Sequence, residues 1–120
     1  MHLSAVDAWV EQETELVTLP DEQPSQDDLA IARQVCERIE PDSILQFGIG
    51  AIPDEIARIL TERPIGGFGI HTEMTSDGVM HLHEAGKVTN RKPLHDGFTI
   101  ATFALGSQKL YRWLDGAPSR

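Results

Sequence analysis

The apolar positions of this 120-residue chain follow two alternating patterns. Apolar residues recur at helical spacing in four segments, each with a residue that favours a helix start at or just before its first position: residues 26–39, 53–63, 76–86 and 107–114. Short runs rich in β-branched and aromatic residues precede these segments and are typical of strands: residues 15–19, 43–47, 66–71 and 98–105. The pattern predicts four strands alternating with four helices.

Strands and helices that alternate in this way are typical of right-handed βαβ units. We therefore expect an α/β fold, a single α/β unit over residues 1–120 with a mostly parallel sheet and flanking helices. In such sheets ligands bind at the carboxyl ends of the strands. That edge would bring together three stretches of the chain: residues 48–53, 71–76 and 105–107.

The composition and charge narrow the range of partners. Hydrophobic residues make up 40% and charged residues 24% of the chain, as in ordinary globular proteins. The net charge is −9, and the acidity lies in residues 1–62, which hold fourteen Asp or Glu and three Arg. A negative field repels a polyanion, so we expect no nucleic-acid partner.

Cysteine usage and the apolar runs bear on localisation. Cys36 is the only cysteine of the sequence, so no disulfide can form within the chain, which suits a reducing compartment. The first residues lack the basic and apolar regions of a secretion signal, and no run approaches the roughly 18 apolar residues of a membrane span. We expect a cytoplasmic protein that does not bind a membrane.

Three features at or next to the predicted edge could have a chemical role. The segment GIGAIP at residues 48–53 joins a predicted strand to a predicted helix. Its glycines permit close backbone approach, and the helix amides favour an anion or oxyanion. A tight bend with a purely structural role is an equally good interpretation. Glu73 follows the next strand, where its carboxylate could attack a thioester or simply be a solvated loop acid. Asp77 is similarly ambiguous: it could have a chemical role, or it could only favour the dipole of the predicted helix in whose first turn it falls.

Two other groups of side chains suggest different ligands. Five histidines are spread over the chain: His2, His71, His81, His83 and His95. His81, His83 and Glu84 cannot all share one face of a helix, and no spacing matches a metal motif, so we expect no metal site. One basic cluster follows the third helix: Lys87, Arg91 and Lys92. It could meet the phosphates of a ligand, but the sequence favours a solvated loop.

Three stretches stand in a characteristic order and spacing: LQFGIGAIPD at residues 45–54, GIHTEMTSDG at 69–78 and ATFALGS at 101–107. Together they resemble the acetyl-CoA hydrolase/transferase family, which includes 4-hydroxybutyrate CoA-transferases. The resemblance covers residues 6–115. It implies the α/β fold that CoA-transferases share with some sugar-phosphate isomerases, in agreement with the fold expected from periodicity.

The resemblance also implies a mechanism and a set of site residues. Such an enzyme moves CoA between carboxylic acids through a glutamyl-CoA thioester, and Glu73 would be its nucleophile. CoA would contact five residues of the loop: Gly48, Ile49, Gly50, Ala51 and Ile52. CoA is then a substrate, the partners are an acyl-CoA and a small carboxylic acid, no metal is involved, and we expect a homo-oligomer.

Members of the family are several times longer than this chain. The chain resembles the first part of their second CoA-transferase domain, without the preceding domain or the later glycine-rich CoA-binding segment. We therefore expect an isolated chain that is inactive, binds CoA weakly and exposes apolar surface. Two other functions stay open: a non-catalytic CoA-binding or protein-interaction module derived from this fold, and a small isomerase of the same fold class.

Overall fold

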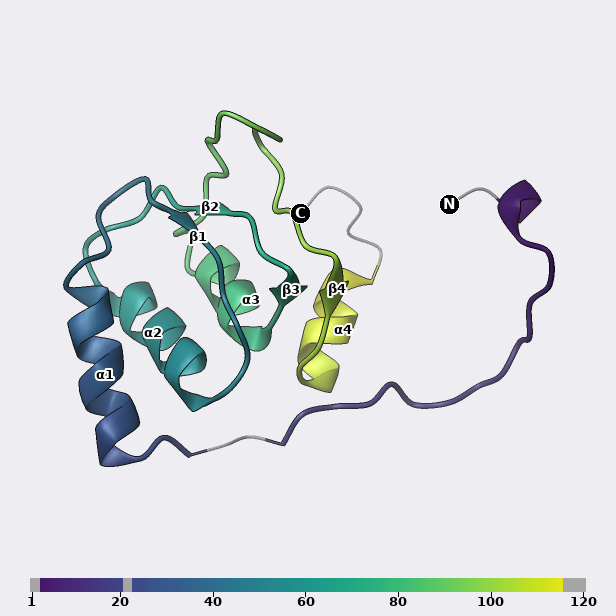
Figure 1. The fold of residues 1–120 in the computed structure, drawn as a ribbon, viewed down its shortest axis with the longest axis horizontal. Coiled ribbons are helices and arrows are strands. Elements are labelled where there is room, and N and C mark those ends of the chain that lie inside the picture. Colours follow the sequence, from purple (N-terminus) through teal and green to yellow (C-terminus); the bar gives the residue numbers. More distant parts are fainter. Residues whose placement is uncertain (1–2, 21–22, 116–120) are drawn as a thin grey trace.

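The computed structural model describes residues 3–20 and 23–115, and Figure 1 shows their path. The helices are α1 (Gln26–Cys36), α2 (Ala51–Glu62), α3 (Asp77–Glu84) and α4 (Gln108–Leu114), with a short 3-10 helix η1 (Leu3–Ala5) near the start. The strands are β1 (Ile44–Leu45), β2 (Gly69–Ile70), β3 (Met74–Thr75) and β4 (Phe103–Ala104). None of the described helices is long and apolar enough to cross a membrane.

All four predicted helices are present, and local side chains explain where α1 begins. The Ser25 hydroxyl accepts a hydrogen bond from the Asp28 amide at 3.2 Å, and the Asp28 carboxylate accepts one from the Ser25 amide at 2.8 Å. This helix ends three residues earlier than predicted, because the chain tightens into shorter-range hydrogen bonds ahead of Pro41. α2 begins two residues before the predicted start at Pro53.

The strands pair in parallel, as the alternating pattern predicts. β1 pairs with β2 and β3 pairs with β4. The Cα partners are Ile44 with Gly69, Leu45 with Ile70, Met74 with Phe103, and Thr75 with Ala104. The strands are shorter than the predicted runs. The pairing partner changes from β1 at Ile70 to Ile100 at His71, and a bend at Glu73 then separates β2 from β3. The fold is therefore α/β, with short parallel strands.

The predicted strand at residues 15–19 is wrong. These residues run extended along the outside of the body and pair with no strand among the described residues (Figure 1). Single hydrogen bonds hold the segment: the Leu19 amide donates to the Gly106 carbonyl at 3.2 Å, and the Tyr111 hydroxyl donates to the Val17 carbonyl at 2.6 Å. A β-prone composition does not make a strand where no sheet edge is available to pair with it.

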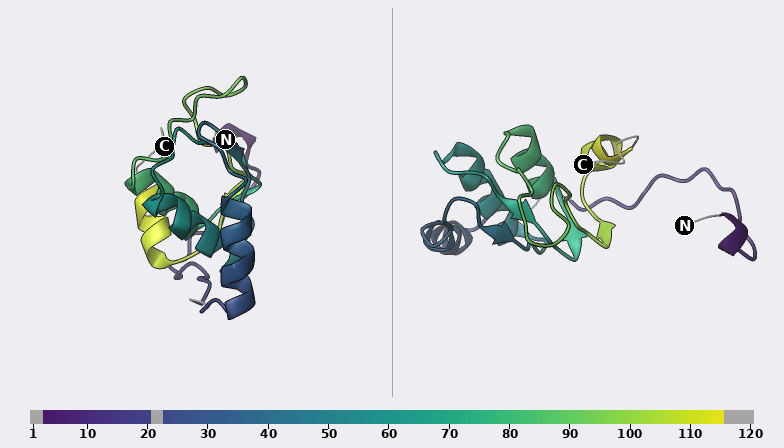
Figure 2. Two further views of the ribbon diagram at one scale, coloured as in Figure 1. Left: turned by 90° about the vertical axis from the view of Figure 1, so that its left-hand side faces the viewer. Right: turned by 90° about the horizontal axis from the view of Figure 1, so that it is seen from above.

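The core lies between the helices and the strands. Figure 2, seen from above, shows α2, α3 and α4 side by side on one side of the strands, and α1 packs against α2. Phe68, Leu60 and Ile70 are among the largest fully buried side chains, each worth about 1.5–3 kcal/mol of burial. A Cβ at Gly78 would lie 2.8 Å from that of Ala57, so only glycine permits this close approach of α3 to α2.

Candidate active site

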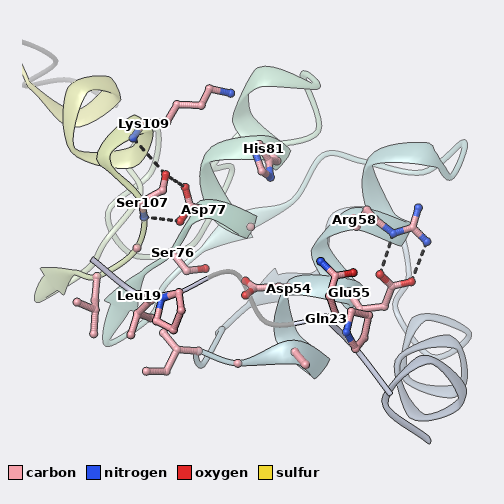
Figure 3. A pocket seen from close by; sticks show the side chains of 18 residues that line it. Leu19, Gln23, Asp54, Glu55, Arg58, Ser76, Asp77, His81, Ser107 and Lys109 are labelled. Carbon is pink, nitrogen blue, oxygen red and sulfur yellow. Dashed lines mark hydrogen bonds and ion pairs between the residues drawn. The ribbon is translucent and has the colours of Figure 1, made fainter. Parts of the chain in front are cut away.

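A cavity of about 840 Å³ lies where the N-termini of α2, α3 and α4 meet (Figure 3). The glycine loop, the first turns of these helices and the turn between β4 and α4 line it, together with part of the extended N-terminal segment. All three stretches predicted to share one edge of the sheet contribute to the lining, through Gly50, Ser76 and Gly106 among others. That prediction of their convergence is confirmed.

The glycine loop presents open backbone to this cavity. Gly50 is the N-cap of α2 with φ at 114°, a conformation that other residues rarely adopt, and no atom lies within 4 Å of the place its Cβ would take. No side chain caps α2, which leaves its first-turn amides for water or a ligand. Of the residues predicted to contact CoA, Ile49, Gly50 and Ala51 line the cavity, whereas Gly48 and Ile52 do not.

Asp77 links the start of α3 to the start of α4. Its carboxylate accepts hydrogen bonds from the Ser107 amide at 2.7 Å and from the Ser107 hydroxyl at 2.5 Å (Figure 3). The same hydroxyl accepts from the amides of Lys109 and Leu110, so it also caps α4. A side chain at Gly106 would collide with the Asp77 carboxylate. Asp77 therefore joins the starts of α3 and α4. Neither of the two interpretations of Asp77 from the sequence includes this role.

Glu55 and Arg58 form a two-point ion pair on the α2 side of the cavity. The Arg58 Nε and Nη2 atoms donate to the two carboxylate oxygens of Glu55 at 2.8 and 2.7 Å. The Glu55 side chain is only 6% exposed, and this guanidinium holds its pKa below the usual value. Arg58 Nη1 also donates to Glu62 at 2.7 Å, and Glu55 raises the pKa of the guanidinium. The charges of Glu55 and Arg58 are therefore already paired within the chain.

Ser76 contributes a buried hydroxyl to the cavity. It is the N-cap of α3 and is 4% exposed. Among the described residues, its Oγ is the one buried side-chain oxygen or nitrogen that has no hydrogen-bond partner. The sequence predicts Ser76 as the cap of this helix; the position is correct, but the capping hydrogen bond is absent.

Glu73, the predicted nucleophile, lies on the bend between β2 and β3 with its side chain exposed, and it is not part of the cavity lining. Its carbonyl accepts hydrogen bonds from the amides of Thr102 and Phe103 at 2.8 and 3.3 Å. The neighbouring Thr72 is buried, and its hydroxyl accepts from the Phe47 amide at 3.1 Å and lies 2.9 Å from the Phe47 carbonyl. The bend is thus tied to the residue that precedes the glycine loop.

The favoured prediction of a solvated basic loop is wrong for two of its three residues. Lys92 is buried, and its Nζ donates to the Ile70 carbonyl at 2.9 Å. Burial lowers the pKa of this amine. Lys87 Nζ donates to the Arg63 carbonyl at 2.5 Å, whereas Arg91 is exposed. Both amines therefore donate to backbone carbonyls, one in β2 and one at the C-cap of α2.

The described histidines do not all gather at one place. His83 Nε2 is 2.8 Å from Thr99 Oγ1, and the rings of His71 and His95 meet edge to face with centroids 6.0 Å apart. His2 lies outside the described residues. Within residues 3–20 and 23–115, no three His, Cys, Asp or Glu side chains gather in a way that could hold a metal ion.

Comparison with known proteins identifies the family of this chain. No family model matches the chain. It is 39% identical over 119 residues to 4-hydroxybutyrate coenzyme A transferase of Clostridium kluyveri, which is 98% of this chain and 27% of that protein. It is also 39% identical over 121 residues to succinyl-CoA:cyclohexane-1-carboxylate CoA transferase of Geobacter metallireducens, with the same coverage of both. The chain belongs to the CoA-transferase family. It spans about a quarter of the length of these relatives.

The fold of this CoA-transferase segment matches a solved structure as well. RipA from Yersinia pestis superposes with a TM-score of 0.91 and 33% sequence identity, over 99% of this chain and 27% of that chain. The resemblance and the α/β class predicted from the sequence are therefore confirmed. The CoA-transferases that it matches are enzymes.

Sequence reasoning missed several residues of this CoA-transferase segment. The ion pair of Glu55 with Arg58 could have been found, because the two stand three residues apart on one helix face. Thr72 and the Asp77 to Ser107 link gave no local signal, since their partners lie 25 and 30 residues away. The unpaired hydroxyl of Ser76 could not be predicted, because a serine at a helix N-cap is expected to bond a first-turn amide.

Proposed function

We propose that this chain forms part of the active site of an acyl-CoA transferase or hydrolase that moves CoA between carboxylic acids through a glutamyl-CoA thioester. The observation that carries the proposal is the 39% identity to named CoA-transferases over 98% of this chain. The chain corresponds to the first part of the second CoA-transferase domain, and other segments complete the site. The geometry that supports the proposal is the open glycine loop beside a cavity at three helix starts.

Glu73 is the nucleophile in this proposal. A carboxylate oxygen of Glu73 bonds to the thioester carbonyl carbon and the carbon–sulfur bond breaks, which gives a mixed anhydride and a CoA thiolate. The thiolate attacks the glutamyl carbonyl, the acyl carboxylate leaves, and a glutamyl-CoA thioester forms. An acceptor carboxylate takes up CoA by the reverse steps, whereas water in a hydrolase releases free CoA and restores Glu73. The exposure of this side chain on a bend supports its access to substrate.

The glycine loop contacts CoA in the same proposal, through Gly48, Ile49, Gly50, Ala51 and Ile52. The open space around Gly50 and the uncapped start of α2 support close approach of a ligand to the backbone. Amides near Gly50 stabilise the oxyanion that develops when the thioester carbonyl is attacked.

The substrates and setting follow from the family. The acyl donor is an acyl-CoA and the acceptor is a small carboxylic acid; the relatives' names contain 4-hydroxybutyrate and cyclohexane-1-carboxylate, so the class of acid is proposed rather than one acid. The enzyme is a cytoplasmic homo-oligomer. The single free cysteine, which is buried at residue 36, supports a reducing compartment.

One observation favours a second candidate, a non-catalytic CoA-binding or protein-interaction module derived from this fold. Glu73 stands outside the lining of the cavity that the loop borders. In a module, the cavity binds its ligand and the Glu73 carboxylate has no chemical task. The two candidates differ in what removal of that carboxylate does.

A chimera separates them. This chain replaces the matching segment of the Clostridium kluyveri enzyme, and CoA transfer from acetyl-CoA to 4-hydroxybutyrate is measured. We expect transfer by the chimera, a loss of about 10⁴-fold or more in Glu73→Gln, and an unchanged rate in Glu62→Gln, which removes another exposed carboxylate. A chimera whose rate survives Glu73→Gln rejects this residue as the nucleophile. A folded chimera that binds CoA without turnover favours the module.

A further inference from the structure

Three serines are the N-caps of helices in the described part of the chain, and one of them behaves differently. The hydroxyls of Ser25 and Ser107 accept hydrogen bonds from first-turn amides at 3.1 to 3.3 Å. Ser76 has the same extended backbone, with φ at −120° and ψ at 175°, yet makes no such bond. Its hydroxyl lies beside the first turn of α3 without bonding any of that turn's amides.

The Ser76 hydroxyl faces Asp54 across the floor of the cavity (Figure 3). Both side-chain oxygens lie close to the place where a Cβ on Gly78 would be, Ser76 Oγ at 3.5 Å and Asp54 Oδ1 at 3.4 Å. Glycine at that position lets α3 approach α2 closely and adds no side chain beside these two oxygens. A buried hydroxyl without a partner is costly, so the arrangement suits a group that arrives from outside the chain.

The charges around the cavity disfavour a phosphate. The ionisable lining side chains include three carboxylates, from Asp54, Glu55 and Asp77, against the cations of Arg58 and Lys109 and the imidazole of His81. Both cations already pair with carboxylates, at 2.7 and 2.8 Å. Uncapped starts of α2 and α3 attract an anion, but a carboxylate already sits in the first turn of each helix.

The remaining lining matches an uncharged ligand. Leu19, Ile49 and Leu105 supply apolar surface. The Ser76 hydroxyl can donate to a carbonyl, and the Asp54 carboxylate has acceptor lone pairs for an N–H group. An amide bears both of these groups and carries no charge. The pantetheine arm of CoA is a flexible chain that contains two such amides and no phosphate.

We propose that the cavity binds the pantetheine arm of CoA and that the Ser76 hydroxyl donates a hydrogen bond to one of its amide carbonyls. The identity of the ligand rests on the proposed function. The contact assigns a binding role to a residue outside the glycine loop and outside the reacting carboxylate. In this arrangement the pantetheine arm of CoA lies between the starts of α2 and α3, and the phosphates of CoA lie elsewhere.

The test follows amide signals of the ¹⁵N-labelled 120-residue chain during titration with pantetheine, with CoA and with adenosine 3′,5′-bisphosphate. Pantetheine and CoA are expected to shift the amides of Gly50, Ser76 and Gly78, and the bisphosphate is expected to leave them in place. Ser76→Ala should keep a dispersed, folded spectrum and bind pantetheine on the order of tenfold more weakly. Ser43→Ala removes a serine hydroxyl at the opposite edge of the sheet and should bind as the parent chain does.

Several outcomes overturn the inference, and they are distinguishable. If the bisphosphate rather than pantetheine shifts the cavity amides, the cavity is a phosphate site. If a folded Ser76→Ala chain binds pantetheine as tightly as its parent, the hydroxyl makes no such contact. In both cases binding of CoA leaves the proposed function standing. If CoA shifts no amide of the glycine loop or the cavity, the inference and the proposed CoA contacts fall together.

Discussion

At the scale of single residues, the surroundings of a side chain decide whether it stabilises the fold. The hydroxyl of Ser107 satisfies two first-turn amides and donates to the Asp77 carboxylate. The hydroxyl of Ser76 occupies the equivalent helix position, is buried, and has no partner in the described part of the chain. The first therefore contributes to stability, whereas the second costs free energy that a ligand can recover.

Substitution of these two serines by alanine should differ in its effect on stability. Ser107→Ala is expected to lower the free energy of unfolding by about 1–2 kcal/mol, because α4 loses its cap and Asp77 loses a donor. Ser76→Ala is expected to leave it unchanged or to raise it by up to about 1 kcal/mol, because an unsatisfied hydroxyl is removed. Urea unfolding followed by circular dichroism measures both, and equal losses would contradict this account.

At the scale of the elements, an ion pair on α2 makes the stability of the fold depend on pH. The guanidinium of Arg58 lowers the pKa of Glu55 from its usual value of 4.5. The unfolded chain therefore binds the proton more readily than the folded chain does. This pair contributes stability that is present above pH 4.5 and is lost as the pH falls through the lower folded-state pKa.

Glu55→Gln should flatten the dependence of stability on pH. The expected result is a smaller loss of urea midpoint between about pH 5 and pH 3 than in the parent chain, because the variant has no carboxylate to protonate at this position. Glu62→Gln, at the exposed end of the same guanidinium, is the control. If Glu55→Gln loses stability with falling pH as steeply as the parent chain, the assignment of this acid response to α2 is incorrect.

The helices could be predicted better than the strands, because the residues that define a helix start are close in sequence and those that define a strand are not. A helix start such as that of α1 depends on residues three apart, Ser25 and Asp28, which the sequence shows directly. A strand depends on an edge supplied by distant residues, and residues 15–19 find none. Lys92 shows the same limit, because its burial depends on a hydrogen bond from its amine to the carbonyl of Ile70 in β2, 22 residues away.

At the scale of the whole molecule, apolar surface is left exposed. The radius of gyration is 15.9 Å, against about 13.6 Å for 120 compact residues. The extended N-terminal segment exposes Trp9 and Val17 to 72% and 78%, and the strands expose Ile44 and Phe103 to about half. Surface of this kind is typical of a binding interface.

The isolated chain is therefore expected to self-associate and to bind an apolar dye. Sedimentation velocity over a range of micromolar concentrations should show species larger than a monomer, and dye fluorescence should rise in parallel. Val17→Ser should reduce both signals, whereas Glu15→Gln in the same segment removes no apolar surface and should not. A chain that stays monomeric without binding dye would contradict the expectation.

The most direct test of the central claim is the mass of the protein after it meets an acyl-CoA. The chimera with the Clostridium kluyveri enzyme is incubated with acetyl-CoA, quenched, and measured intact and after digestion. The account predicts an added mass of one CoA less water, carried by the peptide that contains Glu73 and absent in Glu73→Gln. An adduct that maps to Asp77 or Glu84, or that persists in Glu73→Gln, would show that the carboxylate on the bend between β2 and β3 is not the nucleophile.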